Sequence, residues 1–223
     1  MLGSARSVMM KPSTPPTPSL PAAYATYNFN ENTGSIAADS SGNGRNLTIV
    51  SASWATGHTG SALSNTAATT GATSTMAVPS TTITLAAWVK PLQLNSGDTN
   101  FAFGFFNGSS TRVAFFTQRG DFGDPNVLQF NLHNGGLAAV MGTALTLNTW
   151  THIAATYTGT TVKVYQNGVV TGTGAVNGAL TSSSDFYVAG GNSIDTQVVV
   201  DDVRVFDVAL TDAEVVIAMN TPV

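Results

Sequence analysis

The sequence lacks cysteine and is poor in charge, and each absence excludes a class of protein. With no cysteine among 223 residues, the chain can form no disulfide and perform no thiol chemistry. Charged residues make up 9% and the net charge is −4, which argues against nucleic-acid binding because phosphates are bound by clustered Lys and Arg. No apolar run reaches about 18 residues, so we expect no membrane insertion through a helix. An apolar share of 43% still indicates a folded domain.

Catalytic side chains are also scarce. The chain has three histidines, His58, His133 and His152, and two glutamates, Glu31 and Glu214. It contains no G-x-S-x-G motif, which would place a serine nucleophile on a strand-to-helix turn. In a strand context, His152 is expected to be a buried structural residue. The sequence therefore predicts that the protein is not an enzyme.

The middle of the chain has the strongest β pattern. Residues Trp150–Tyr157 and Thr161–Gln166 are two runs rich in β-branched and aromatic residues, joined by a glycine-containing turn. Asn167-Gly168 then begins a second turn into Val169-Val170. Such runs joined by short turns predict antiparallel hairpins. The same pattern continues through most of the sequence, so we predict an all-β, antiparallel domain.

The N-terminal segment differs in composition from the rest. Residues 1–23 are rich in Ser and Thr and are interrupted by Pro12, Pro15, Pro16, Pro18 and Pro21. This composition favours an extended chain over a helix. The segment has no continuous apolar stretch, so we do not expect it to act as a secretory signal. We predict an extended N-terminal arm at 1–23 and a single domain at 24–223.

One helix is expected near the C-terminus. The segment Thr211-Asp212-Ala213-Glu214 has the spacing of a capping box and precedes the apolar run Val215–Met219. In such a box the threonine hydroxyl accepts from the glutamate amide, and the glutamate side chain accepts from the threonine amide. This pattern predicts a short helix.

Several stretches together resemble a known family. The order W-x-H-I-A-A-T-Y followed by V-K-V-Y-x-N-G within Trp150–Val170 is similar to the laminin-G-like / concanavalin A-like jelly-roll family. Thr82–Pro91, Asp39–Gly44 and Val200–Glu214 resemble its early core strand, its N-terminal loop and its closing strand with a capped helix. The resemblance implies an antiparallel β-sandwich of jelly-roll type with one short C-terminal helix. It implies little about activity, because the family is mostly non-catalytic and its ligands vary.

A carboxylate pair in the closing strand needs an explanation. Strict alternation along Val199–Val205 places Asp201 on the face of Val203 and Val205, and Asp202 on the opposite face. Opposed in this way, the two carboxylates cannot act on one substrate bond, and the E-x-D-x-x-E motif of jelly-roll glycosidases is absent. A carboxylate on an apolar face is costly unless a cation or donors meet it.

The resemblance implies a structural calcium site at the sandwich edge, with ligands from the N-terminal loop and the closing strand. The matching residues are Asp39, Asn43 and Asp201, with backbone carbonyls completing the oxygen shell that Ca²⁺ prefers. The alternative is that Asp39 caps its own turn and that Asp201 accepts backbone amides.

A ligand site is predicted in the loop 118–126. Glycan sites use exposed aromatic rings beside carboxylate and amide groups, and this loop contains Asp121, Phe122 and Asp124. We therefore predict these three residues as ligand contacts.

Two functions fit these observations. The first is a non-catalytic structural or adhesion protein of a virion, such as a phage capsid decoration, head-fibre or tail component. It would bind other subunits through residues 1–22 and display its sandwich on the virion surface. The proline-rich arm, the neutral surface and the missing signal favour it. The alternative is a glycan-binding accessory module of a bacterial secreted or cell-surface system, located outside the cell. Both can coexist if a displayed sandwich binds host-surface glycans.

Overall fold

The computed structural model describes residues 19–66, 70–94, 100–107, 111–119, 127–133, 137–176, 178, 180, 182–190 and 197–223. Residues 1–18 of the predicted arm lie outside this set, so the boundary at residue 23 stays a prediction. The predicted ligand contacts Asp121, Phe122 and Asp124 also lie outside the described residues.

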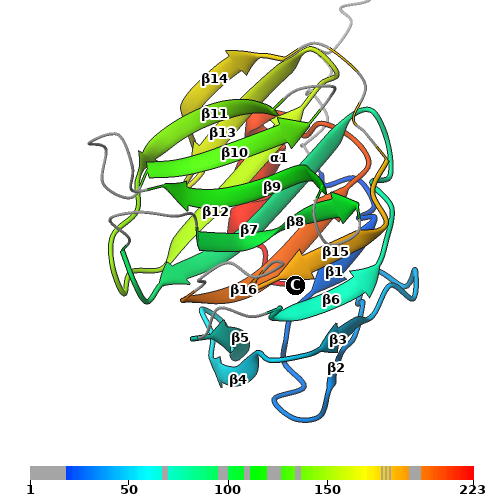
Figure 1. The fold of residues 1–223 in the computed structure, drawn as a ribbon, viewed down its shortest axis with the longest axis vertical. Helices are drawn as coiled ribbons and strands as arrows, with labels where there is room; N and C mark the ends of the chain where they lie inside the picture. Colours follow the sequence, from blue (N-terminus) through cyan, green and yellow to red (C-terminus); the bar gives the residue numbers. More distant parts are fainter. Residues whose placement is uncertain are drawn as a thin grey trace, which may run out of the picture.

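In the described ranges the chain forms two eight-stranded antiparallel sheets that stack face to face (Figure 1). Sheet A has the spatial order β14 (Val169–Ala175), β13 (Thr161–Gln166), β12 (Thr151–Tyr157), β7 (Ile83–Pro91), β16 (Val198–Phe206), β5 (Ser61–Asn65) and β4 (Ser53–Thr56), with β1 (Ala25–Tyr27) also paired to β16. Sheet B has the order β11 (Leu137–Ala144), β10 (Val127–His133), β9 (Thr111–Arg119), β8 (Asn100–Asn107), β15 (Asp185–Val188), β6 (Ala72–Thr75), β3 (Leu47–Ile49) and β2 (Ile36–Ala37). This architecture confirms the predicted all-β antiparallel sandwich.

The central hairpins form where the sequence predicts them. β12 pairs with β13 from Ile153↔Gln166 to Tyr157↔Val162. β13 then turns through Asn167 and Gly168, whose φ angles are 49° and 77°. Asn and Gly tolerate this left-handed conformation, which the tight turn into β14 requires.

The core lies between the sheets and is rich in aromatic rings. Phe103 and Phe116 lie 5.1 Å apart between ring centroids, and Phe105 and Phe186 lie 4.8 Å apart. All four rings are buried. Burying one such side chain stabilises a fold by about 2 to 3 kcal/mol, so this layer supplies much of the force that holds the sheets together.

β16 has a bulge at the point where its neighbour changes. On one edge it pairs with β7 along its whole length. On the other edge it pairs with β5 along Val198–Val200 and with β1 along Val203–Val205. Between these two stretches the register to β7 shifts, and Asp202 has a φ of 46°. An extra residue in one strand reverses the alternation of the side chains beyond it.

The bulge corrects the predicted orientation of Asp201. Val200, Val203 and Val205 belong to the core between the sheets, whereas Asp201 pairs with Trp88 on the outer face of sheet A. Asp201 therefore does not share a face with Val203 and Val205. The alternation from which opposite faces were predicted for Asp201 and Asp202 does not hold at this point of the strand.

The single helix found in the described part of the chain is α1 (Asp212–Asn220), and it begins with the predicted capping box at Thr211 and Glu214. Its buried residues Val215 and Ala218 pack in one cluster with the side chains of sheet A that point away from the core, Ala86, Ala154, Tyr165 and Phe206. Figure 1 shows α1 (red) behind the sheet that contains β7 and β12. No helix in the described ranges is long and apolar enough to span a membrane.

The described end of the predicted arm contacts its own domain. Leu20 and Ala23 pack against the cluster under α1. The Asn43 side chain donates to the carbonyl oxygens of Ala23 and Tyr24, at 3.2 and 3.1 Å. This end of the arm therefore packs against the sandwich through Leu20 and Ala23.

Candidate functional site

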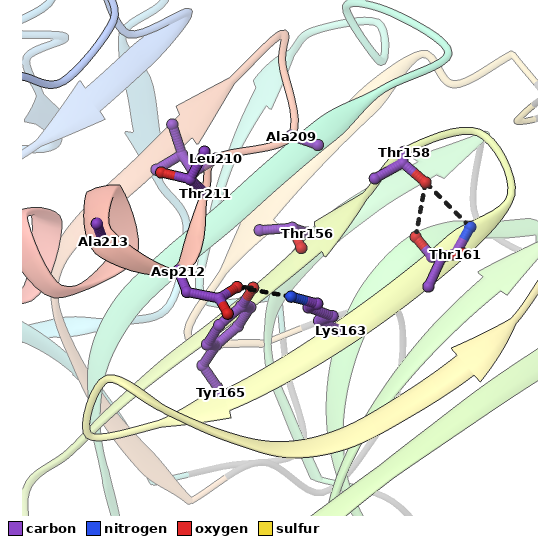
Figure 2. Close-up of a pocket in the computed structure, with 10 residues that line it drawn as sticks. All are labelled: Thr156, Thr158, Thr161, Lys163, Tyr165, Ala209, Leu210, Thr211, Asp212 and Ala213. Atoms are coloured by element: carbon purple, nitrogen blue, oxygen red, sulfur yellow. Dashed lines mark hydrogen bonds and ion pairs between the residues drawn. The ribbon is translucent and has the colours of Figure 1, made fainter. Parts of the chain in front are cut away.

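A pocket of about 510 Å³ lies on the outer face of sheet A, beside the first turn of α1 (Figure 2). Its walls come from the ends of β12 and β13 and from the segment that leads into the helix. Seven of the ten lining residues have a polar group, and their methyl groups, methylenes and rings contribute apolar surface beside it. The residues are Thr156, Thr158, Thr161, Lys163, Tyr165, Ala209, Leu210, Thr211, Asp212 and Ala213.

Three side chains form a hydrogen-bonded network in this pocket. Oδ1 of Asp212 accepts from Nζ of Lys163 at 2.7 Å and from the hydroxyl of Tyr165 at 2.8 Å. Figure 2 shows Asp212 reaching from the helix toward the other two residues, which project from β13. Lys163 and Tyr165 are two positions apart in the strand, so they share a face. The helix cap fixes the position of Asp212 opposite them.

The network remains open to solvent. The side chains of Lys163 and Asp212 are 40% and 59% exposed. An ammonium group has three donor hydrogens and a carboxylate has about four acceptor positions, so the pair can also bond ligand hydroxyls. Thr158 and Thr161 supply further hydroxyl groups at the other end of the opening.

The electrostatics of the pocket suit binding better than proton transfer. Hydrogen bonds from Lys163 and Tyr165 hold the pKa of Asp212 below its usual range. Burial, reinforced by the Asp212 carboxylate, raises the pKa of Tyr165 to about 12. Asp212 is therefore ionised and Tyr165 protonated across the neutral range, so neither is poised to act as a general acid or base.

The predicted metal ligands Asp39 and Asn43 lie in one loop. The Asp39 carboxylate accepts three backbone amides, from Thr26, Ser41 and Arg45, each at 3.0 Å. Burial alone would raise the pKa of Asp39, but hydrogen bonds from the Ser41 side chain and from these amides outweigh it and lower the pKa. Asn43 directs its amide donors at the carbonyls described above. The loop is thus closed by its own backbone.

The third predicted ligand, Asp201, has different partners. It is fully buried, and its two oxygens accept the amides of Asp202 at 2.8 Å and of Thr59 at 3.0 Å. Thr59 belongs to the turn between β4 and β5. Burial raises the pKa of Asp201 to about 6, which the Thr59 amide opposes.

These contacts agree with the alternative in which Asp39 caps its turn and Asp201 accepts backbone amides. Among the described residues, no three His, Cys, Asp or Glu side chains lie close enough together to hold a metal ion. Asp39 and Asn43 are brought together in one loop, whereas the amide partners of Asp201 are in a different turn. The donor set therefore shows no common cradle for calcium, and the calcium site stays a prediction.

The pocket was not predicted from the sequence. Its network joins Lys163 and Tyr165 to Asp212, which is separated from them by 49 and 47 positions. Two local signals lay close to it: the hairpin strand that carries Lys163 and Tyr165, and the capping box that starts at Thr211. What the sequence did not show is that α1 packs across that strand.

A family model now adds to this geometry. The model of the concanavalin A-like lectin/glucanases superfamily in its laminin-G form matches residues 64–216. The chain belongs to this superfamily. The match includes every residue of the pocket, whereas Asp39 and Asn43 precede it.

Several solved structures share this fold. Domain 4 of AbnA, a GH43 extracellular arabinanase from Geobacillus stearothermophilus in complex with arabinotriose, is similar with a TM-score of 0.67 and 24% identity, over 88% of this chain and 98% of that domain. The receptor binding domain of botulinum neurotoxin type G has a TM-score of 0.72 and 15% identity, over 90% of this chain and 51% of that chain. The binding domain of Paraclostridial mosquitocidal protein 1 has a TM-score of 0.69 and 16% identity, over 89% of this chain and 52% of that chain.

These similarities show a shared fold. The chain spans about half of the two toxin chains and nearly all of the arabinanase domain. No curated protein matches the chain by sequence.

Proposed function

We propose that this chain is a non-catalytic glycan-binding module and that the pocket beside α1 binds the sugar. The observation that carries the proposal is the exposed Lys163–Asp212 ion pair, which the buried Tyr165 hydroxyl holds in place and threonines border. Sugar hydroxyls both donate and accept hydrogen bonds, so they match an ammonium, a carboxylate and several hydroxyls within one opening.

The superfamily and one solved relative support this ligand class. The arabinanase domain is similar over almost its whole length and is described in complex with arabinotriose. Arabino-oligosaccharides are therefore a suitable first probe. The two toxin domains are named for binding rather than for catalysis, which is consistent with a module that attaches a larger system to a surface.

The absence of an enzymatic role is part of the proposal. The pocket lining contains one carboxylate, which is ion-paired, and hydrolysis of a glycosidic bond generally requires two carboxyl groups on either side of that bond. The module would hold a glycan without cleaving it. Incubation with arabinotriose should give no shorter product by chromatography, and turnover would contradict the proposal.

A location outside the cell follows from the same proposal, because the glycans in question are extracellular. The virion interpretation gains no support from the superfamily or from these relatives and stays a prediction of the sequence. It can be tested with a chain that lacks residues 1–18, which leaves the packed residues Leu20 and Ala23 in place. Such a chain should fold yet fail to enter the assembly.

A glycan array followed by calorimetry tests the pocket. The wild-type protein should bind a defined subset of oligosaccharides, and Asp212→Asn and Thr161→Ala should each weaken that binding about tenfold, the equivalent of one lost hydrogen bond.

Matched controls lie on the other sheet. Asp185→Asn and Thr48→Ala make the same chemical changes in β15 and β3, so they should bind like the wild type. Silence on the array, or equal loss in the pocket and control variants, would remove the proposal.

A further inference from the structure

An aromatic cluster lies on the outer face of sheet A, toward the opposite end of β12 from the pocket. Trp88 in β7 pairs in register with His152 in β12, and their rings meet edge to face at 5.5 Å. The imidazole of His58, from the turn between β4 and β5, stacks on Trp88 with centroids 3.6 Å apart and planes 10° apart. Three segments distant in sequence thus build one aromatic stack.

A second indole lies nearly perpendicular to this stack. Trp150, just before β12, meets His58 at 5.9 Å with an interplanar angle of 77°. The ammonium of Lys90 lies 5.0 Å from the centre of the Trp150 ring. We call these four residues, His58, Trp88, Lys90 and Trp150, the aromatic corner. His58 is exposed and the other three are half-buried, so the corner faces solvent.

Buried groups hold the turn that carries His58. The Thr59 amide, next in the chain, donates to the fully buried carboxylate of Asp201. At Gly57 a Cβ would lie 2.5 Å from that carboxylate, so only glycine allows this close approach. A buried carboxylate is costly to keep, and here its direct effect is to fix the turn against Trp88.

A buried histidine lies beside the stack and contacts Trp88. His152 is 2% exposed, and its Nδ1 has no hydrogen-bond partner among the described residues. Buried polar atoms are normally hydrogen-bonded, so this nitrogen is an exception beside the stack.

We propose that the aromatic corner is a second ligand site and that it takes a carboxylate-bearing sugar ring. The exposed His58 ring and the half-buried Trp150 ring offer surface for the apolar side of the sugar. Lys90 supplies the positive charge that would attract the carboxylate of the sugar. The nearby carboxylates of Asp201 and Asp202 are buried, so they do not face that ligand. The proposal rests on the proposed function for its ligand class, but it involves none of the residues of the pocket.

The family match includes three of the four residues of the corner. The family match begins at residue 64, whereas His58 and the turn that carries it lie before that point. Trp88, Lys90 and Trp150 lie within the match.

Tryptophan fluorescence reads this surface directly, because the chain has three tryptophans and two of them are in the corner. The third, Trp54, lies in β4 and donates its indole hydrogen to Gly34 at 3.0 Å. Titration with trigalacturonate should change the emission of the full-length protein saturably, with half-saturation below about 1 mM. The change should persist in Trp54→Phe and disappear in the folded double variant Trp88→Phe/Trp150→Phe.

Two further variants separate the contributions. His58→Ala should weaken binding about tenfold, the loss expected for one stacked ring. Lys90→Met should bind trigalacturonate no better than the neutral arabinotriose, whereas the wild type should prefer the acidic probe. Far-UV circular dichroism would confirm that each variant is folded.

The outcome is independent of the pocket. Thr161→Ala and Asp212→Asn should keep the full fluorescence response even if the glycan array is silent. The proposal is overturned if trigalacturonate produces no saturable change, if His58→Ala responds like the wild type, or if the response depends on Trp54.

Discussion

Two buried carboxylates, one in the loop around Asp39 and one behind the turn after β4, differ in how the protein surrounds them. Asp39 is 9% exposed and accepts three backbone amides. Asp201 is fully buried and accepts two. The pKa of Asp39 is lowered, whereas burial raises the pKa of Asp201 to about 6. Burial acts in the same direction on both, but Asp201 is more deeply buried and lies beside the Asp202 carboxylate, whereas Asp39 also accepts from the Ser41 side chain.

The difference separates two uses of a buried charge. Around Asp39 the ionised form is favoured, so the carboxylate stabilises the loop at neutral pH. Behind the β4–β5 turn the ionised form is disfavoured, so the carboxylate is retained at a cost in stability. Asp201 fixes the turn that carries His58. We therefore infer that its role is to position this turn rather than to stabilise the fold.

The largest effect is expected from removing the better-satisfied carboxylate. Asp39→Ala leaves three backbone amides without their acceptor, one of them from the buried strand β1, and should lower the free energy of unfolding by about 3 kcal/mol at pH 7. Urea unfolding measures this change. Asp207→Asn, at an exposed position, serves as the control and should stay within about 0.5 kcal/mol of the wild type. A small loss in Asp39→Ala would remove the contrast between the two carboxylates.

The pH dependence of stability should distinguish Asp201 next. Its folded pKa of about 6 lies above the usual 3.8, so its stabilising contribution is complete below pH 3.8 and is lost as the pH rises through 6. Compared with Asp201→Asn, the wild type should therefore lose about 2 kcal/mol between pH 4 and pH 7. Asp39 has the opposite sign, since its contribution is present above pH 3.8 and is lost as the pH falls. A difference between wild type and Asp201→Asn that does not vary with pH contradicts this assignment.

Glycine substitutions in the two turns should differ by a smaller amount. Gly57→Ala places a methyl group 2.5 Å from the Asp201 carboxylate and 2.6 Å from the Ser61 carbonyl, and should cost about 2 kcal/mol. Gly42→Ala, in the loop after Asp39, meets nothing within 4 Å but has a φ of +85°, and should cost about 1 kcal/mol. Urea unfolding gives both values. Equal losses would mean that the approach to Asp201 is not tight.

Calcium should have the smallest effect. If the predicted site at Asp39, Asn43 and Asp201 binds with a dissociation constant of about 1 mM, then 1 mM calcium stabilises the fold by about 0.4 kcal/mol. Because these side chains already have backbone partners, thermal unfolding should show a shift smaller than this between calcium and a chelator, and a shift of this size in the wild type that is absent from Asp39→Asn would establish the site. Identical melting with both additives would leave the backbone amides as the only partners of these carboxylates.

Local patterns predicted the elements of this protein well. The Asn167-Gly168 turn and the capping box at Thr211 and Glu214 each depend on a few neighbouring residues, so the sequence shows them directly. The two-sheet sandwich followed from many such elements in the family's order.

The orientation of Asp201 could not be obtained in this way. It depends on a bulge, and the bulge occurs where β16 exchanges β5 for β1 as its neighbour. Strict alternation contains no information about that exchange. It therefore placed Asp201, which faces outward before the bulge, on the same face as Val203 and Val205, which face the core after it.

The two candidate sites also escaped prediction for a topological reason. The pocket joins Lys163 to Asp212, and the aromatic corner joins His58 to Trp88 and Trp150. The corner is assembled by strand order, and the pocket also depends on the packing of α1 on sheet A. A single sequence shows these residues but not that the fold brings them into contact. The predicted ligand contacts Asp121, Phe122 and Asp124 lie outside the described residues and remain predictions.

The place of β16 in sheet A has a consequence for biosynthesis. Residues 198–206 lie between residues 83–91 on one side and residues 25–27 and 61–65 on the other. A nascent chain therefore cannot close this sheet until residue 206 has left the ribosome exit tunnel. Until then, the edges of β1, β5 and β7 that pair with β16 remain unpaired. Contacts between residues so distant in sequence also form slowly. We expect translation to outpace folding here, so the newly made protein should rely on holding chaperones more than a helical protein of equal length would.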